Sequence, residues 1–129
     1  MPKIKPRESV IFAEDFYGMV EWYQKVLGFK STHLVEDGYH YCNLENEGGV
    51  RIGIAEANEM GVLLGDRKHN SVVLQVQVSD LPQFFDYLKE EGGAVTFGPS
   101  YNKKDGFWFG GFQDLEGNPF WAVDDNCPG

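Results

Sequence analysis

The chain has 129 residues, of which 42% are hydrophobic and 24% charged, a composition that suits one globular domain whose core needs no disulfide or metal support. Its net charge of −9 argues against nucleic acid as a partner, because the summed field repels phosphate. The chain has only two cysteines, which predicts a cytoplasmic protein. It has no apolar segment of about 18 residues and no apolar leader at the N-terminus, so we expect neither a membrane span nor a signal peptide.

Aromatic residues make up 15% of the chain, with ten Phe, six Tyr and three Trp. This is more than a small core needs, so we expect an aromatic-lined cavity or an extensive interface. The acidic charge would favour a cationic small molecule, although it is also explained by solubility alone.

The first half predicts a strand over residues 8–13, followed by a helix that Asp15 caps and Gly28 ends. The apolar residues of this helix recur at helical spacing and form one stripe along it. Three strands are expected next, over residues 30–35, 39–44 and 50–55. Glycine-containing turns at 37–38 and 48–49 separate them.

Residues 56–70 are polar and predict a linker. The second half then repeats the order of the first. A strand is expected over residues 71–78, and a helix begins at the Asp80 cap and ends at Gly92 and Gly93. Strands are expected over 95–97, 107–112 and 120–123, with a hairpin turn at 114–118.

The two halves therefore have the same order of elements, and the segment beginning at Asp15 is repeated 65 positions later at Asp80. This predicts an α+β fold of two tandem βαβββ modules, with the helices on one face of the sheet. We expect one domain over residues 1–129. Module one spans about 1–58, the linker about 57–70 and module two about 71–129.

The run from Asp15 through Trp22-Tyr23 to Leu27-Gly28-Phe29 is similar to the D-x6-F-Y-x3-L-G-F signature of the vicinal oxygen chelate superfamily. That superfamily includes glyoxalase I, extradiol dioxygenases, and fosfomycin and bleomycin resistance proteins. Residues 114–118 resemble its D-P-x-G-N turn, with Leu115 in place of Pro. The resemblance covers nearly the whole chain. It implies a glyoxalase-like, cup-shaped mixed sheet with the helices outside, commonly completed by dimerisation.

The resemblance also locates four positions at which the superfamily's enzymes place metal ligands. Here these positions hold Glu8, Val73, Trp121 and either Ile52 or Gly53. Only Glu8 can coordinate a cation, whereas a catalytic zinc, nickel or iron ion needs about three protein ligands. We therefore predict no metal site, no catalytic residue and no cofactor.

Trp121 stands where the resemblance implies a metal-binding Glu, and strand parity places it opposite Phe120 and Ala122. It either plugs the cup as packing or offers a stacking surface to a planar or cationic ligand. Phe12 shares the strand face of Glu8, and family geometry favours Phe109 on the neighbouring strand. The parity of residues 107–109 alone does not decide which of them faces inward.

His40 and Cys42 are two positions apart on an expected strand, so they would share a face. They could form half of a soft-metal site, although such residues more often belong to the core. The predicted ligand-binding residues are Glu8, Phe12, His40, Phe109 and Trp121.

Two functions are compatible with these features. The first is a non-metal binding protein of the bleomycin-resistance type, which as a bacterial antibiotic-resistance protein would sequester a cationic or aromatic ligand in an acidic, aromatic-lined groove of a homodimer. The alternative is a metal-dependent lyase, isomerase or dioxygenase of the same superfamily, which would recruit His40 beside Glu8.

Overall fold

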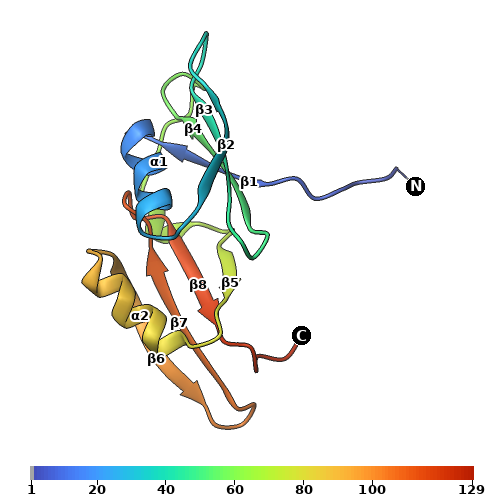
Figure 1. Ribbon diagram of the computed structural model, residues 1–129, viewed down its shortest axis with the longest axis vertical. Coiled ribbons are helices and arrows are strands. Elements are labelled where there is room, and N and C mark those ends of the chain that lie inside the picture. Colours follow the sequence, from blue (N-terminus) through green and yellow to red (C-terminus); the bar gives the residue numbers. More distant parts are fainter. Residues whose placement is uncertain (1) are drawn as a thin grey trace. The chain divides into compact units, whose positions relative to one another are not determined.

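The computed structural model describes residues 2–129, apart from the side chain of residue 68. The chain divides into two compact units, one ending at Leu64 and the next beginning at Gly65. This boundary falls within the predicted linker. Figure 1 shows the helices and strands of both units.

The first unit contains β1 (Ser9–Ala13), α1 (Phe16–Lys25), β2 (Lys30–Val35), β3 (Tyr41–Glu45) and β4 (Arg51–Glu56). Its sheet has the strand order β1-β4-β3-β2 (Figure 1). β1 pairs with β4 in parallel and the other pairs are antiparallel, so the sheet is mixed.

The second unit repeats this topology. After a short 3-10 helix, η1 (Arg67–His69), it contains β5 (Leu74–Gln77), α2 (Leu81–Glu90), β6 (Ala94–Asn102), β7 (Phe107–Gln113) and β8 (Pro119–Val123). The strand order is β5-β8-β7-β6, with a parallel β5–β8 pair and two antiparallel pairs. The predicted α+β fold of two βαβββ modules is confirmed.

Both helices begin where the sequence predicts, because an aspartate caps each one. The Asp15 carboxylate accepts a hydrogen bond from the Gly18 N–H at 3.0 Å, and Asp80 accepts one from the Gln83 N–H at 3.1 Å. Gly92, just after α2, has a φ of 82°, a left-handed conformation that glycine adopts without strain.

Each sheet buries one face beneath its helix. In the first unit Met19 and Tyr23 of α1 are fully buried, as are Cys42 of β3 and Ile52 and Ile54 of β4. In the second unit the buried set comes from α2, β7 and β8: Leu81, Phe85, Leu88, Phe112, Phe120 and Ala122. The opposite surface of each sheet is called here its helix-free face.

Three predicted strands differ from those observed by two or more residues at an end. β5 spans only Leu74–Gln77, whereas a strand over residues 71–78 was expected. β6 extends to Asn102 rather than ending at residue 97, because it is an edge strand in which Pro99 costs no ladder bond. Register shifts around Phe97 absorb the irregularity. β3 begins at Tyr41 rather than residue 39, since the His40 N–H donates to the Glu59 carboxylate at 2.7 Å instead of to a strand.

The hairpin turn before β8 forms without the proline of the motif it resembles. The buried Asp114 carboxylate accepts hydrogen bonds from the backbone N–H groups of Glu116 and Asn118, at 3.0 and 2.9 Å. It also accepts one from the Asn118 side-chain amide at 2.8 Å. These bonds hold the turn, so Leu115 can occupy the proline position.

Candidate functional site

Glu8 is the centre of a polar cluster on the helix-free face of the first sheet. The Asn43 amide donates to both carboxylate oxygens at 2.9 Å, and the Tyr41 hydroxyl donates a short hydrogen bond to Oε2. Tyr41 and Asn43 alternate along β3 with the buried Cys42, which faces α1. The carboxylate just before β1 is therefore held in one orientation by two residues of β3.

These contacts determine the charge state of the cluster. Partial burial raises the pKa of Glu8, but the hydrogen bonds from Tyr41 and Asn43 outweigh it, so the pKa lies below its ordinary value. Burial and the same hydrogen bond raise the pKa of Tyr41. At neutral pH the pair is a fixed carboxylate and a neutral phenol.

The register of β4 resolves which of its residues lies beside Glu8. Gly53 pairs with Val10 of β1 and with Asn43 of β3, so it belongs to the helix-free face. Ile52 is fully buried on the other side. A Cβ on Gly53 would lie 1.9 Å from the Tyr41 hydroxyl oxygen and 2.5 Å from Glu8 Oε2. The tyrosine hydroxyl thus occupies the space that a β4 side chain would need.

Gly53→Ala should destabilise the first unit by about 1–3 kcal/mol, because the added methyl displaces both Tyr41 and Glu8. The measurement is urea denaturation followed by circular dichroism. Gly48→Ala is the matched control, since the nearest atom to its Cβ would be 3.6 Å away. Equal stability of the two variants would contradict the packing of Tyr41 over Gly53.

Tyr41→Phe should lower the free energy of unfolding at pH 7 by about 1 kcal/mol, the value of a partly solvated hydrogen bond to a charged group. Folding lowers the pKa of Glu8. The ionised carboxylate therefore stabilises the folded state at a pH above the pKa of Glu8 in the unfolded chain. This stabilisation is lost as the pH falls through the pKa of Glu8 in the folded state. The difference between wild type and variant should therefore disappear on acidification. Tyr39→Phe, at an exposed tyrosine, serves as control. A difference that persists at low pH would refute the assignment.

The helix-free face of the second sheet is aromatic. Trp121 of β8 is 53% exposed, while its neighbours Phe120 and Ala122 are buried against α2. Phe97 of β6 is 41% exposed and contacts Trp121 edge to face, with ring centroids 6.3 Å apart. The Trp121 indole is thus supported at one edge by a second ring and has much of its surface exposed to solvent.

Gly111 of β7 allows this arrangement. A Cβ on Gly111 would lie 2.2 Å from the Phe97 ring, so only glycine leaves room for that ring on the sheet. Gly111 pairs with Trp121, and Phe109 pairs with Val123, so Phe109 shares the face of Trp121 as predicted. Phe109 also contacts Phe107, with centroids 5.9 Å apart.

The four positions at which the resemblance places metal ligands do not form a metal site. Within the first unit they are Glu8 and Gly53, and within the second they are Val73 and Trp121. Gly53 has no side chain, Val73 is aliphatic and the Trp121 indole has only an N–H donor. The single carboxylate already accepts hydrogen bonds from Tyr41 and Asn43. This donor set does not fit a catalytic metal ion.

His40 does not join the other predicted residues of the first unit. Its ring lies on the helix side of the sheet, 5.4 Å from Phe16 and 5.8 Å from Tyr17 of α1. Glu8 and, by strand parity, Phe12 lie on the opposite face. His40 and Cys42 lie on the same side of the sheet, but Cys42 is fully buried and the imidazole contacts Glu56 and Glu59 instead.

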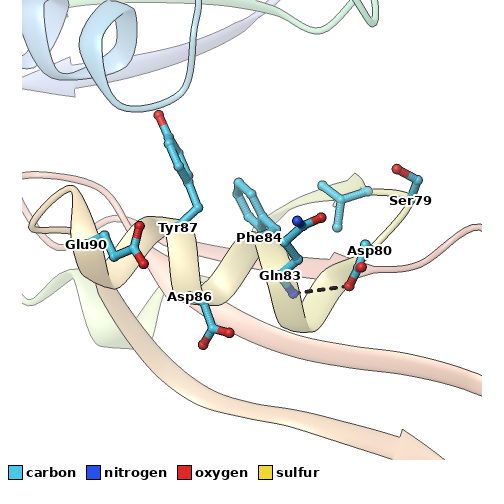
Figure 2. A pocket seen from close by; sticks show the side chains of 8 residues that line it. Ser79, Asp80, Gln83, Phe84, Asp86, Tyr87 and Glu90 are labelled. Carbon is cyan, nitrogen blue, oxygen red and sulfur yellow. Dashed lines mark hydrogen bonds between the residues drawn. The ribbon is translucent and has the colours of Figure 1, made fainter.

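An open hollow lies along the outer side of α2 (Figure 2). Its lining contains neither His nor Cys, and Asp80 is engaged in capping the helix. Asp86 and Tyr87 point in different directions in Figure 2, so they do not converge on one point. The lining residues are Val78, Ser79, Asp80, Gln83, Phe84, Asp86, Tyr87 and Glu90.

The sequence reasoning missed Tyr41, Asn43 and Phe97. Alternation along β3 could have placed Tyr41 and Asn43 together on one face. Their convergence on Glu8, however, depends on β3 lying beside β4 and β4 beside β1. Phe97 was assigned to the correct strand, yet its contact with Trp121 depends on the pairing of β6 with β7.

No helix in the described part of the chain is both long enough and apolar enough to cross a membrane. Comparison with curated proteins finds no match to the chain.

Comparison with solved structures finds the same fold in several bacterial proteins. A member of the glyoxalase/bleomycin resistance protein/dioxygenase superfamily from Sphaerobacter thermophilus is 20% identical, with a TM-score of 0.76, and the match covers 95% of this chain and 98% of the other. A domain of the same description from Frankia sp. is 20% identical, with a TM-score of 0.75 and coverages of 95% and 93%. The fosfomycin resistance protein FosX from Listeria monocytogenes is 12% identical, with a TM-score of 0.75 and coverages of 95% and 94%.

The family model of the Glyoxalase/Bleomycin resistance protein/Dioxygenase superfamily matches residues 8–122. This segment begins at Glu8 and ends one residue after Trp121, so it includes both helix-free faces described above. The chain therefore belongs to the glyoxalase/bleomycin resistance protein/dioxygenase superfamily.

Proposed function

We propose that this protein is a non-catalytic member of its superfamily that sequesters a cationic or aromatic small molecule. The observation that carries the proposal is the replacement of the metal-binding side chains. Gly53 and Val73 provide no donor, and an exposed Trp stands at the fourth position. A site with these residues can hold a molecule by stacking and charge, but it lacks the groups that polarise a substrate.

The ligand chemistry follows from the two helix-free faces. Trp121 offers an indole face, the aromatic surface that attracts cations most strongly. Glu8 remains ionised and oriented by its contacts with Tyr41 and Asn43. The net charge of −9 adds a long-range field that attracts cations and repels anions. Together these features favour a planar aromatic cation.

The proposal includes a homodimer with acidic and aromatic ligand-binding surfaces. Their aromatic residues include Phe12 in the first unit and Phe109 in the second. Exposed apolar side chains on the helix-free faces support it, since Val10 of β1 is 47% exposed and Phe97 and Trp121 are also accessible. Sedimentation velocity at micromolar concentration tests the dimer independently of ligand binding.

The biological role proposed here is resistance to a toxic small molecule in a bacterial cytoplasm. It is supported by the family description, which includes bleomycin resistance proteins, and by the structural similarity to a fosfomycin resistance protein. The donor set at the four metal positions does not favour a metal-dependent lyase, isomerase or dioxygenase.

Equilibrium dialysis with proflavine, a planar aromatic cation, tests the proposal. We expect saturable binding of one dye per subunit, weakened by added salt because charge contributes. Anthracene-2-sulfonate, a planar anion, is the control and should bind much more weakly. No proflavine binding up to about 1 mM, where the binding free energy is only about −4 kcal/mol, would refute the proposal.

A further inference from the structure

A second cluster of charged side chains lies on the helix side of the first sheet, away from Glu8. His40 directly precedes β3, Glu56 ends β4 and Glu59 lies in the turn that follows. His40 Nδ1 makes a short hydrogen bond with Glu59 Oε1 and lies 3.4 Å from Glu56 Oε2. One ligand atom from each of the three residues lies within 4.8 Å of the other two.

The backbone holds this cluster in place. The second oxygen of Glu59 accepts the His40 backbone N–H at 2.7 Å, so its carboxylate binds the same residue at two points. The Phe16 and Tyr17 rings pack edge-on against the imidazole, with centroids at 5.4 and 5.8 Å. The imidazole and the Glu59 carboxylate are therefore oriented before any ligand arrives, which lowers the entropic cost of binding.

The cluster has an excess of negative charge. Glu36 adds to this negative charge. Its carboxylate accepts a short hydrogen bond from the Tyr17 hydroxyl, and its charge raises the pKa of His40. Two carboxylates thus contact the imidazole, and the charge of a third raises its pKa further. Among the side chains that the structure describes, no Lys or Arg forms an ion pair with any of them. A cation bound here would relieve the repulsion between Glu56 and Glu59.

We propose that His40, Glu56 and Glu59 form a binding site for a divalent transition-metal ion. One imidazole nitrogen and two carboxylate oxygens are the ligand types that Zn²⁺, Co²⁺, Ni²⁺ and Mn²⁺ accept, whereas Ca²⁺ and Mg²⁺ prefer oxygen ligands alone. Water would complete the coordination. Within the first unit the site is separate from the Glu8 cluster, since the imidazole lies on the α1 side of the sheet and Glu8 on the other.

Metal binding at this site must compete with a proton. The hydrogen bond to Glu59, with further attraction from Glu56 and Glu36, raises the pKa of His40, and the reciprocal bond lowers the pKa of Glu59. Nδ1 faces both carboxylates, and it would have to be unprotonated to coordinate an ion, so the imidazolium proton would leave to solvent on binding. The titratable groups that face His40 are Tyr17, Glu36, Glu56 and Glu59.

The test is titration of the full chain with Co²⁺, followed by its visible absorption and by metal analysis after dialysis. We expect one ion per subunit at pH 8, and weaker binding as the pH falls, because a protonated imidazole cannot coordinate the ion. His40→Gln and Glu59→Gln should each weaken binding at least about tenfold. Thermal unfolding shows whether each variant is folded, and Glu56→Gln provides a third variant if either is not.

Two matched controls locate the ion. His69→Gln removes another histidine next to a carboxylate, since His69 Nε2 lies 3.6 Å from Asp66, and Glu8→Gln removes the carboxylate on the helix-free face. Both should bind Co²⁺ as wild type does. Absence of uptake, unchanged affinity in folded His40→Gln, or loss of uptake in either control would overturn the proposal. Proflavine binding is measured on the same variants, so failure here remains distinguishable from failure of the sequestration proposal.

Discussion

Phe85→Ala is expected to lower the free energy of unfolding of the second unit by about 3–5 kcal/mol, the usual cost of deleting a buried phenyl ring. Phe85 is fully buried on the inner side of α2, and its ring lies against Gly110 of β7. A Cβ on Gly110 would be 2.4 Å from that ring, so helix and strand approach at a distance that only glycine allows.

Phe97→Ala is the matched control for this experiment. Its ring packs on Gly111, the next residue of the same strand, but on the helix-free face, where it is 41% exposed. We expect a loss of only about 1 kcal/mol, most of it from the edge-to-face contact with Trp121. Urea denaturation of both variants gives the comparison. Equal losses would show that the helix-free face is buried in solution, contrary to its role as an accessible binding surface.

Trp121→Ala is expected to weaken proflavine binding by about tenfold or more, because a desolvated cation–π contact contributes about 2 kcal/mol. Trp121→Phe keeps an aromatic face and should retain part of the affinity. Equilibrium dialysis with detection of the dye avoids any dependence on the fluorescence of the replaced tryptophan.

Leu115→Ala is the control for loss of an exposed apolar side chain. Leu115 is 52% exposed, close to the 53% of Trp121, and it lies in the turn before β8 of the same unit. Its replacement should leave proflavine affinity unchanged. If Trp121→Ala binds the dye as wild type does, stacking on this face is not the mechanism and the proposed site is wrong.

Much of the fold could be predicted because its signals are local. Asp15 and Asp80 cap the two helices as expected, since a cap needs only a carboxylate three residues before a free N–H. The turn before β8 is similarly determined by Asp114 and Asn118. Alternating residues on β8 correctly separated Trp121 from its buried neighbours.

The candidate site was predicted only in part, because convergence of side chains depends on strand pairing. The sequence indicated Glu8 and Trp121, but it left Ile52 and Gly53 as alternatives for the same position. Pairing of β4 with both β1 and β3 selects Gly53 and brings Tyr41 over it. No local pattern contains this information, since the contact between Tyr41 and Glu8 spans 33 positions.

His40 shows the same limit. Parity placed His40 on the face that Cys42 shares, but it gave no sign of Glu56 and Glu59, whose carboxylates contact the imidazole while Cys42 is buried in the core. The sequence by itself determined the duplicated βαβββ order, the helix caps, the turn before β8 and the lack of metal ligands at the superfamily's positions, because each depends on residue type and short spacing. Only the tertiary structure decided that β3 supplies the partners of Glu8, that Phe97 supports Trp121, and that His40 meets two carboxylates, because these contacts join strands and turns distant in the chain.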